Sequence, residues 1–178
     1  MIPILLALAF IAIIFIVVTA GRPDEFVVSR STKISAPPDK VFLNVNDFHK
    51  WEAWSPWAKL DPACKYSHEG PVAGAGAGFR WAGNKKVGEG SMTILESRPG
   101  DFIRIKLQFL KPFKAVSTVE FTFQAQGNQT LVTWDMFVKN NFMSKAMGLF
   151  MNCDKMVGGD FDRGLASLKS LAETPAKS

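Results

Sequence analysis

The sequence predicts an α+β protein, in which a curved antiparallel sheet of about seven strands packs on a long C-terminal helix and a single transmembrane helix precedes the domain. Three observations predict this class. The first twenty residues carry no charged side chain. Several later segments alternate apolar and polar residues between turn residues, which is typical of strands with one buried face. The last segment keeps helical spacing with an apolar stripe made of Val157, Phe161, Leu165, Leu168 and Leu171.

Length and composition limit what the chain can be. Its 178 residues suit one tether and one domain, and 21% charged with 12% aromatic residues indicate a globular chain rather than a disordered one. The formal net charge is +5, but the basic residues are scattered and no RNA-binding aromatic motif accompanies them. We therefore expect no nucleic-acid partner.

Residues 1–20 form an almost continuous apolar run, close to the roughly 20 residues that cross a bilayer. A cleaved signal peptide is the alternative, since Val18, Thr19 and Ala20 are small enough for a cleavage site. The run has no preceding Lys or Arg and exceeds the usual length of a signal peptide core, which favours an anchor. The cations that follow it predict a single-pass protein of the cell membrane with a cytoplasmic domain: Arg22, Arg30, Lys33 and Lys40.

After a hinge at residues 21–25, the domain begins with a strand in which Phe26, Val28 and Ile34 alternate with polar residues. The segment Ala36-Pro37-Pro38-Asp39 ends that strand. A short helix follows, because Val41, Phe42, Val45 and Phe48 keep helical spacing. We expect a second short helix or turn at residues 51–54.

The middle of the chain predicts a meander of strands at 64–69, 77–82, 86–97, 101–110, 115–125 and 129–138. Hairpin turns are indicated at residues 98–101, 111–113 and 127–128, and short connections imply antiparallel pairing. Ile103, Ile105, Leu107 and Phe109 share one face in this pattern. The same alternation places Arg104, Glu120 and Asp135 on the wet face.

Beyond Asn140 the pattern is helical again, with a short segment at residues 144–150 and then the long C-terminal helix. Gly158 and Gly159 lie inside that helix, where glycine costs stability, so they mark a kink or a close backbone approach. We expect residues 174–178 to form a disordered tail.

Several motifs occur together along residues 26–173. They are Ile34-x-Ala36-Pro37 before Val41-Phe42, Trp54-Ser55-Pro56-Trp57, Asp61-Pro62, Gly76 to Trp81 followed by Gly83-Asn84, Gly88-x-Gly90-x-Met92-Thr93-Ile94, and Asp160-Phe161-x-x-Gly164-Leu165-x-x-Leu168-Lys169. With these motifs the sequence resembles the bacterial polyketide cyclase/dehydrase and lipid-transport family of SRPBCC proteins, in the START-like superfamily. The resemblance implies a helix-grip (START/Bet v 1-like) fold with a deep cavity between the sheet and the C-terminal helix, and it supplies no universal catalytic residue.

Large apolar residues are the candidates for contact with a ligand in that cavity. They are Trp54, Trp57, Trp81, Phe109, Phe121, Phe123, Trp134, Met136, Val157 and Phe161. The same residue types build ordinary cores, so a purely structural role remains the alternative for each. For the tryptophans of residues 51–57, contact with a bilayer surface is a third possibility.

Catalytic and metal-binding patterns are weak. His49 and His68 are the natural general bases, but no nucleophile motif accompanies them and we expect exposed or capping roles. Two histidines and the distant Cys64 and Cys153 do not predict a metal site. The glycines of residues 74–78 predict a flexible hairpin connection rather than a nucleotide loop. We assign no catalytic residue, metal or cofactor.

These observations favour a membrane-tethered, non-enzymatic module that binds an apolar small molecule or lipid. An enzyme of the cyclase or dehydrase type is the first alternative, and it requires an inward-facing polar group in the cavity. A subunit for protein interaction or stress response, with a collapsed core, is the second. A cavity well below about 300 Å³ would favour that last hypothesis.

Overall fold

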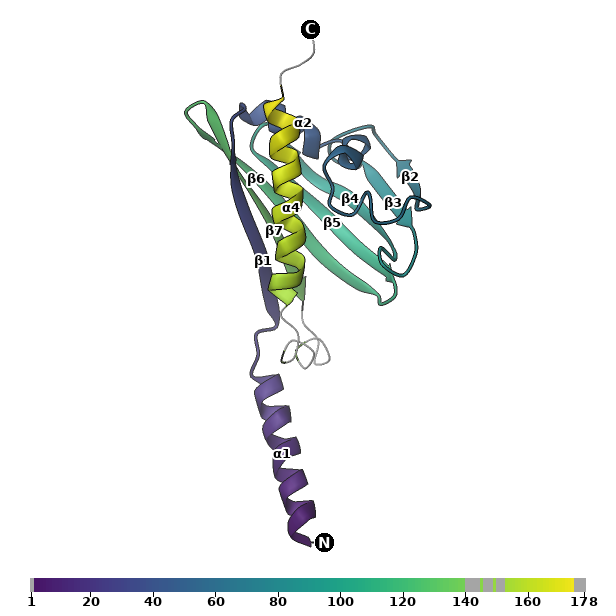
Figure 1. Ribbon diagram of the computed structural model, residues 1–178, viewed down its shortest axis with the longest axis vertical. Coiled ribbons are helices and arrows are strands. Elements are labelled where there is room, and N and C mark those ends of the chain that lie inside the picture. The colour runs from purple at the N-terminus through teal and green to yellow at the C-terminus, as the bar shows by residue number, and fades with distance from the viewer. Residues whose placement is uncertain (1, 140–144, 146–148, 150–152, 175–178) are drawn as a thin grey trace.

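The computed structural model describes residues 2–139, 145, 149 and 153–174, and there the chain forms one curved seven-stranded sheet with a long helix across it (Figure 1). In chain order the elements are α1 (Ile2–Ala20), β1 (Glu25–Ile34), α2 (Pro38–Val45), the 3₁₀ helix η1 (Phe48–Ala53), β2 (Lys65–Glu69), β3 (Gly78–Ala82), β4 (Glu89–Arg98), β5 (Phe102–Lys111), β6 (Ala115–Gln126), β7 (Gln129–Lys139) and α4 (Cys153–Glu173).

The sheet is an antiparallel meander closed on one side by the first strand, in the order β1-β7-β6-β5-β4-β3-β2. Its register brings the apolar positions of neighbouring strands together, with Ile105 opposite Val119 and Phe121 opposite Trp134. On the outer face Arg104 forms ion pairs with Glu96 at 2.6 Å and Glu120 at 2.8 Å. The alternation expected from the sequence therefore correctly separates the two faces of the sheet.

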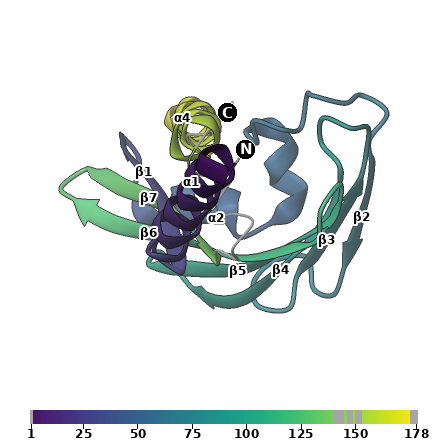
Figure 2. The same ribbon diagram turned by 90° about the horizontal axis from the view of Figure 1, so that it is seen from below.

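The sheet curves around the elements on its concave side. Seen from below, α4, α2 and the η1 region all lie within this curve (Figure 2). Side chains from the sheet and from these elements meet there, and the largest fully buried ones are Trp54, Trp134, Phe121, Phe161, Ile34, Ile94, Ile103, Ile105, Leu165 and Leu168. Because the curved sheet is wider than one helix, α4 and η1 share its concave face.

Helix α4 is bound by polar contacts near both of its ends, at its start to Arg30 of β1 and at its end to Ser35, which follows β1. Near its start, the Arg30 guanidinium pairs with Asp154 at 3.1 Å and passes over Gly158. Near its end, the Ser35 backbone N–H donates to the Glu173 carboxylate at 2.6 Å. For the glycine pair a kink or a close approach of backbone was expected, but at Gly158 the approaching group is the side chain of Arg30, and no such approach occurs at Gly159.

The N-terminal helix α1 extends away from the sheet (Figure 1) and exposes large apolar side chains, including Phe10, Ile11 and Val17. Among the described residues, however, no helix combines the length and the apolarity that a membrane crossing needs. The transmembrane anchor expected at residues 1–20, and the single-pass localisation inferred from it, are not supported.

Two other expectations concern regions that are only partly described. Most of the short helical segment expected at residues 144–150 lies outside the described residues, as do residues 175–178 of the expected tail.

The strand boundaries differ from the expected ones by at most a few residues, the largest difference being the start of β4 at Glu89. Residues before Glu89 belong to the connection from β3, in which Gly83 N–H donates to Gly88 O.

Candidate ligand-binding cavity

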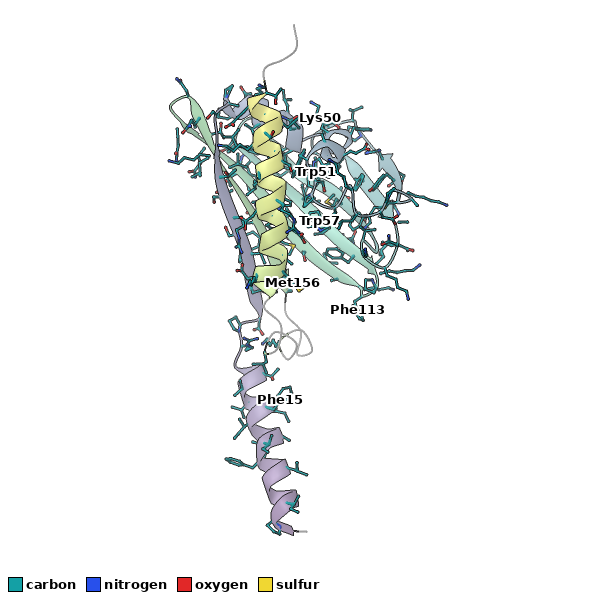
Figure 3. All side chains as sticks on the ribbon, in the orientation of Figure 1. Phe15, Lys50, Trp51, Trp57, Phe113 and Met156 are labelled. Atoms are coloured by element: carbon teal, nitrogen blue, oxygen red, sulfur yellow. The ribbon has the colours of Figure 1, made fainter. Side chains whose placement is uncertain are left out.

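A cavity of about 400 Å³ lies on the concave face, between the sheet, α4, η1 and the residues that follow η1. Figure 3 shows Trp51 and Trp57 in this region, beside α4 and over the sheet. The sheet contributes Tyr66, His68, Phe79, Trp81, Met92, Leu107, Phe109, Val119, Trp134 and Met136, and α4 contributes Val157, Asp160 and Phe161. The remaining walls are Phe48, His49, Trp51, Glu52, Ser55, Trp57, Ala58, Cys64, Lys86 and Val87.

The α4 side of the cavity rests on a pair of stacked rings. Trp134 of β7 lies parallel to Phe161 of α4, with ring centroids 4.0 Å apart and an interplanar angle of 8°. Trp57 meets both rings edge-on, at 5.9 Å from Trp134 and 6.4 Å from Phe161. Gly164 lies close enough to this group that a β-carbon there would be 2.9 Å from the Trp134 ring. These closely packed rings therefore form an apolar wall on the α4 side of the cavity.

The structure separates the candidate ligand contacts into two sets. Seven of the candidates line the cavity: Trp57, Trp81, Phe109, Trp134, Met136, Val157 and Phe161. The other three, Trp54, Phe121 and Phe123, are buried in the core and do not line it. Phe123 instead packs edge-on against Phe42 of α2, at 5.6 Å. Phe121 and Phe123 lie on the same face of β6 as the cavity residue Val119, but other side chains fill the space over them.

The indole N–H groups are mostly used by the protein itself. Trp51 donates to Val45 O at 2.8 Å, Trp54 donates to Asn44 O at 3.1 Å and Trp81 donates to Val87 O at 3.0 Å. Within the described part of the chain, the buried Nε1 of Trp134 has no hydrogen-bond partner. A buried unpaired donor is costly, so the Trp134 indole offers the cavity wall a polar atom that the described part of the protein does not satisfy.

Polar side chains of the cavity concentrate where η1 faces β2. His49 of η1 stacks on His68 of β2, with ring centroids 3.8 Å apart and an interplanar angle of 15°. The Nδ1 atom of His49 lies 2.8 Å from Asp47 Oδ1, and that oxygen also accepts the His49 backbone N–H at 2.9 Å. Asp47 therefore caps η1 and orients the imidazole at the same time.

Tyr66 lies beside this pair on the same face of β2, stacked on Phe79 at 5.5 Å. Burial, together with hydrogen bonding to Cys64 and the negative charges of Glu52 and Asp61, raises the pKa of Tyr66 to about 12. Its phenol consequently keeps its proton throughout the neutral range and can serve as a donor.

Asp61 joins the two loops beside the cavity. Its carboxylate is buried and accepts the Ala63 N–H at 3.1 Å and the Asn84 N–H at 2.7 Å. Asn84 belongs to the connection between β3 and β4, from which Lys86 and Val87 reach the cavity. One carboxylate thus holds the loop after η1 against the loop after β3.

The two histidines are the site residues that the sequence analysis missed. Both are exposed, as expected, but both also line the cavity, which the sequence did not indicate. Two signals in the sequence were available: Cys64, Tyr66 and His68 alternate along one strand face, and Asp47-x-His49 is a spacing that lets a cap contact a ring. Neither signal reveals that η1 folds against the edge strand β2.

The sequence comparison covers the whole domain that surrounds this cavity. Residues 25–173 match the model of the family described as polyketide cyclase / dehydrase and lipid transport. The chain belongs to this family. No curated protein matches the sequence of this family member at a significant level.

Solved structures similar to this polyketide cyclase/dehydrase and lipid-transport family member share its fold at low identity. The protein CV1439 of Chromobacterium violaceum superposes with a TM-score of 0.59 and is 15% identical, covering 86% of this chain and 100% of its own. The Aha1 dimer of Colwellia psychrerythraea has a TM-score of 0.60 and 14% identity, over 83% of this chain and 96% of its own. DynU16, a protein of the dynemicin biosynthetic locus, has a TM-score of 0.58 and 18% identity, over 86% of this chain and 48% of its own. At these identities the similarity establishes the fold alone.

Proposed function

We propose that this protein binds an apolar small molecule or a lipid in the cavity between its sheet and α4. The observation that carries the proposal is the cavity itself, about 400 Å³ in volume and walled mainly by aromatic and aliphatic side chains. Ligand pockets in proteins are typically about 300–1,000 Å³ and are lined in this manner, with a few polar groups that orient the ligand.

The size of the cavity also weighs against a collapsed core. Protein interiors rarely contain voids larger than a water molecule, because each unfilled space forfeits dispersion contacts. A space of about 400 Å³ is far above that size. An apolar ligand would restore the lost contacts around Trp57, Phe109 and Phe161, and burial of its own surface would drive binding. The membership of the chain in a lipid-transport family is consistent with this chemistry.

The proposal is tested first with the full-length chain purified without added lipid. Native mass spectrometry and solvent extraction are expected to find a bound apolar molecule. Val157→Phe adds a ring to a residue that lines the cavity, so it is expected to reduce the occupancy strongly. Met156→Phe adds the same ring at the preceding position of α4, which is exposed and outside the cavity, and this variant is expected to retain full occupancy of the cavity by the ligand.

Equal occupancy in the two variants, or an empty protein that also ignores added apolar molecules, would argue against a ligand in this cavity. Thermal unfolding of both variants shows whether each is still folded. A lower occupancy in a variant that remains folded means that the cavity is blocked, whereas a loss of folding would explain the lower occupancy in another way.

A cyclase or dehydrase activity is the second candidate, and the pairing of Asp47 with His49 beside the cavity is what favours it. An imidazole oriented by a carboxylate is a common general base, able to remove a proton next to a carbonyl group. The full-length protein would be incubated with a synthetic poly-β-ketone. A cyclised or dehydrated product that disappears in His49→Gln supports an enzyme, and unchanged starting material supports the binding function alone.

A further inference from the structure

We propose that the ligand of this cavity is an uncharged amphiphile whose hydroxyl group donates a hydrogen bond to Nε2 of His49, while its apolar body lies among the aromatic walls. This inference rests on the proposed function, because it assigns the polar end of the same cavity. It adds the chemical class of the ligand, an alcohol with a large apolar body, and the direction in which the ligand lies.

The polar and apolar parts of the cavity are segregated. On the α4 side and over the middle of the sheet the walls are apolar apart from Asp160, with Trp134, Met136 and Phe161 among them. Most of the polar side chains lie instead on η1 and β2 or in the connections beside them. Every residue of β2 is exposed, and the strand forms an edge of the sheet. A ligand that satisfies both regions has an apolar body and a polar end placed near solvent.

The hydrogen bond between His49 and Asp47 determines which ring nitrogen carries the proton. His49 Nδ1 lies 2.8 Å from Asp47 Oδ1, and a carboxylate oxygen can only accept, so Nδ1 is the donor. In the neutral imidazole, Nε2 then has a lone pair and no proton, and it acts as an acceptor. Within the described part of the chain, no group donates a hydrogen bond to this nitrogen.

The acceptor nitrogen of His49 is placed where the polar end of a ligand would reach it. Asp47 is not one of the cavity walls, whereas His49 is. The ring edge that faces Asp47 is therefore turned away from the cavity, which leaves the edge with Nε2 for a ligand. The ring of His68 stacks on His49 at 3.8 Å and limits its rotation. Because the His49 side chain is 48% exposed, a ligand hydroxyl would replace solvent at Nε2.

Most carboxylates near this end of the cavity are already compensated by groups of the protein. Asp47 accepts from His49, and Asp61 accepts from two backbone N–H groups. Asp160 of α4 forms an ion pair with Arg163. These carboxylates oppose an anionic headgroup, yet they do not need a cationic ligand to balance them.

The remaining charges also favour an uncharged headgroup. Glu52 and Lys86 both line the cavity and carry opposite charges, and the phenol of Tyr66 keeps its proton at neutral pH. An anion has no proton to donate to Nε2 of His49. An ammonium group could donate, but it would add to the charge of Lys86 and would lose more hydration beside aromatic walls. A hydroxyl group supplies the proton at the lowest cost of desolvation.

The test compares dodecanol with its isomer methyl undecyl ether, by titration of the tryptophan fluorescence of the full-length protein. The two molecules have the same atoms and an oxygen near one end, but only the alcohol has a proton to donate. The quantity compared between variants is the ratio of the dodecanol affinity to the ether affinity, because this ratio cancels the difference in hydrophobicity.

His49→Phe keeps a ring at this position and removes the acceptor. The affinity ratio is expected to fall about three- to tenfold in this variant, as for the loss of one uncharged hydrogen bond. Lys50→Phe is the matched control, because it adds the same ring at the adjacent exposed position of η1, outside the cavity. Its ratio is expected to equal that of the wild type.

A second measurement needs no substitution and so does not depend on the folding of a variant. Nitrogen NMR of the full-length protein with isotope-labelled histidine is recorded at about pH 7.5, above the range in which imidazoles ordinarily gain charge. Nε2 of His49 is expected to show the chemical shift of an unprotonated nitrogen. This resonance should move upfield with dodecanol and stay in place with the ether.

Dodecanoate and dodecylammonium, titrated at the same pH, are expected to bind more weakly than dodecanol. Tighter binding of either ion would overturn the uncharged headgroup and leave the cavity as a binding site. The same holds for an unchanged affinity ratio in a folded His49→Phe, for a protonated Nε2 in the unliganded protein, or for a preference that is lost only in His68→Phe. Failure of both dodecanol and the ether to bind would overturn the subsite together with the proposed function.

Discussion

The guanidinium of Arg30 occupies the space that a β-carbon would take at Gly158, where β1 lies against α4. From that position Arg30 reaches Asp154 at 3.1 Å and Asp162 at 3.4 Å on the same helix. The absence of a side chain at Gly158 therefore lets the Arg30 guanidinium lie against α4, and this helix is one wall of the cavity.

Replacing Gly158 by alanine should destabilise the protein even though alanine favours helices. The new methyl group displaces the arginine from its ion pairs, and we expect a loss of about 1 kcal/mol in the free energy of unfolding. Gly159→Ala is the matched control, because its β-carbon would meet only Arg163, at 3.9 Å. That change should raise the free energy of unfolding by up to about 1 kcal/mol, as measured by urea denaturation. A stabilising Gly158→Ala would show that Arg30 is free to move away.

The pairing of Arg30 with Asp154 should make stability fall in acid. The hydrogen bond from Arg30 lowers the pKa of Asp154 below its ordinary value. A carboxyl whose pKa is lowered in the folded state stabilises that state above its unfolded pKa, and the contribution is lost as the pH falls through the folded pKa. Asp154→Asn should therefore flatten the decline of the unfolding free energy below about pH 4. An unchanged decline would assign the acid sensitivity to other carboxyls, such as Glu173, whose pKa is lowered by the Ser35 N–H.

Removal of the Asp61 carboxylate should loosen the loops beside the cavity. Asp61→Ala leaves the Asn84 N–H without its acceptor, and we expect a loss of about 1–3 kcal/mol. Hydrogen exchange at the Asn84 amide should become faster than in the wild type. Asp101→Ala removes an exposed carboxylate that pairs with Arg98 and should cost less than about 1 kcal/mol. Equal losses in the two variants would mean that Asp61 is not a structural link.

A methyl group at Gly164 should press on the stacked rings of the cavity wall. Its β-carbon would lie 2.9 Å from Trp134, which is stacked on Phe161, and 3.1 Å from Pro56. Gly164→Ala is expected to cost about 1–3 kcal/mol and to change the tryptophan fluorescence spectrum. Gly159→Ala, on the same helix, should leave the spectrum as it is.

The strands of the sheet could be predicted from the sequence because apolar and polar residues alternate regularly along them. Ile103, Ile105 and Leu107 all face inward as expected, and Arg104 and Glu120 pair on the outer face. The residue patterns predicted the order of the elements, and the resemblance to the family supplied the place of the cavity. The transmembrane expectation at residues 1–20 rested on the length and apolarity of that run and on the charges beside it, and no helix among the described residues supports it.

The cavity residues could be predicted only in part, for a physical reason. The alternation of apolar and polar residues predicts that Phe121, Phe123 and Trp134 lie on the same face of the sheet. It does not predict which of them are covered by a helix and which border an open cavity. Phe123 is covered by Phe42, while Trp134 borders the cavity. The contact between His49 and His68 depends on how η1 folds back against an edge strand, and no local pattern encodes that tertiary contact.

The presence of an apolar ligand inside the sheet is tested most directly by nuclear Overhauser effects between dodecanol and isotope-labelled methionine methyl groups of the full-length protein. Met92 and Met136 line the cavity, and Met156 is exposed on α4 outside it. We expect effects from the alkyl chain to Met92 and Met136 and none to Met156. Effects to Met156 alone, or to no methionine while dodecanol is bound, would contradict a ligand in this cavity.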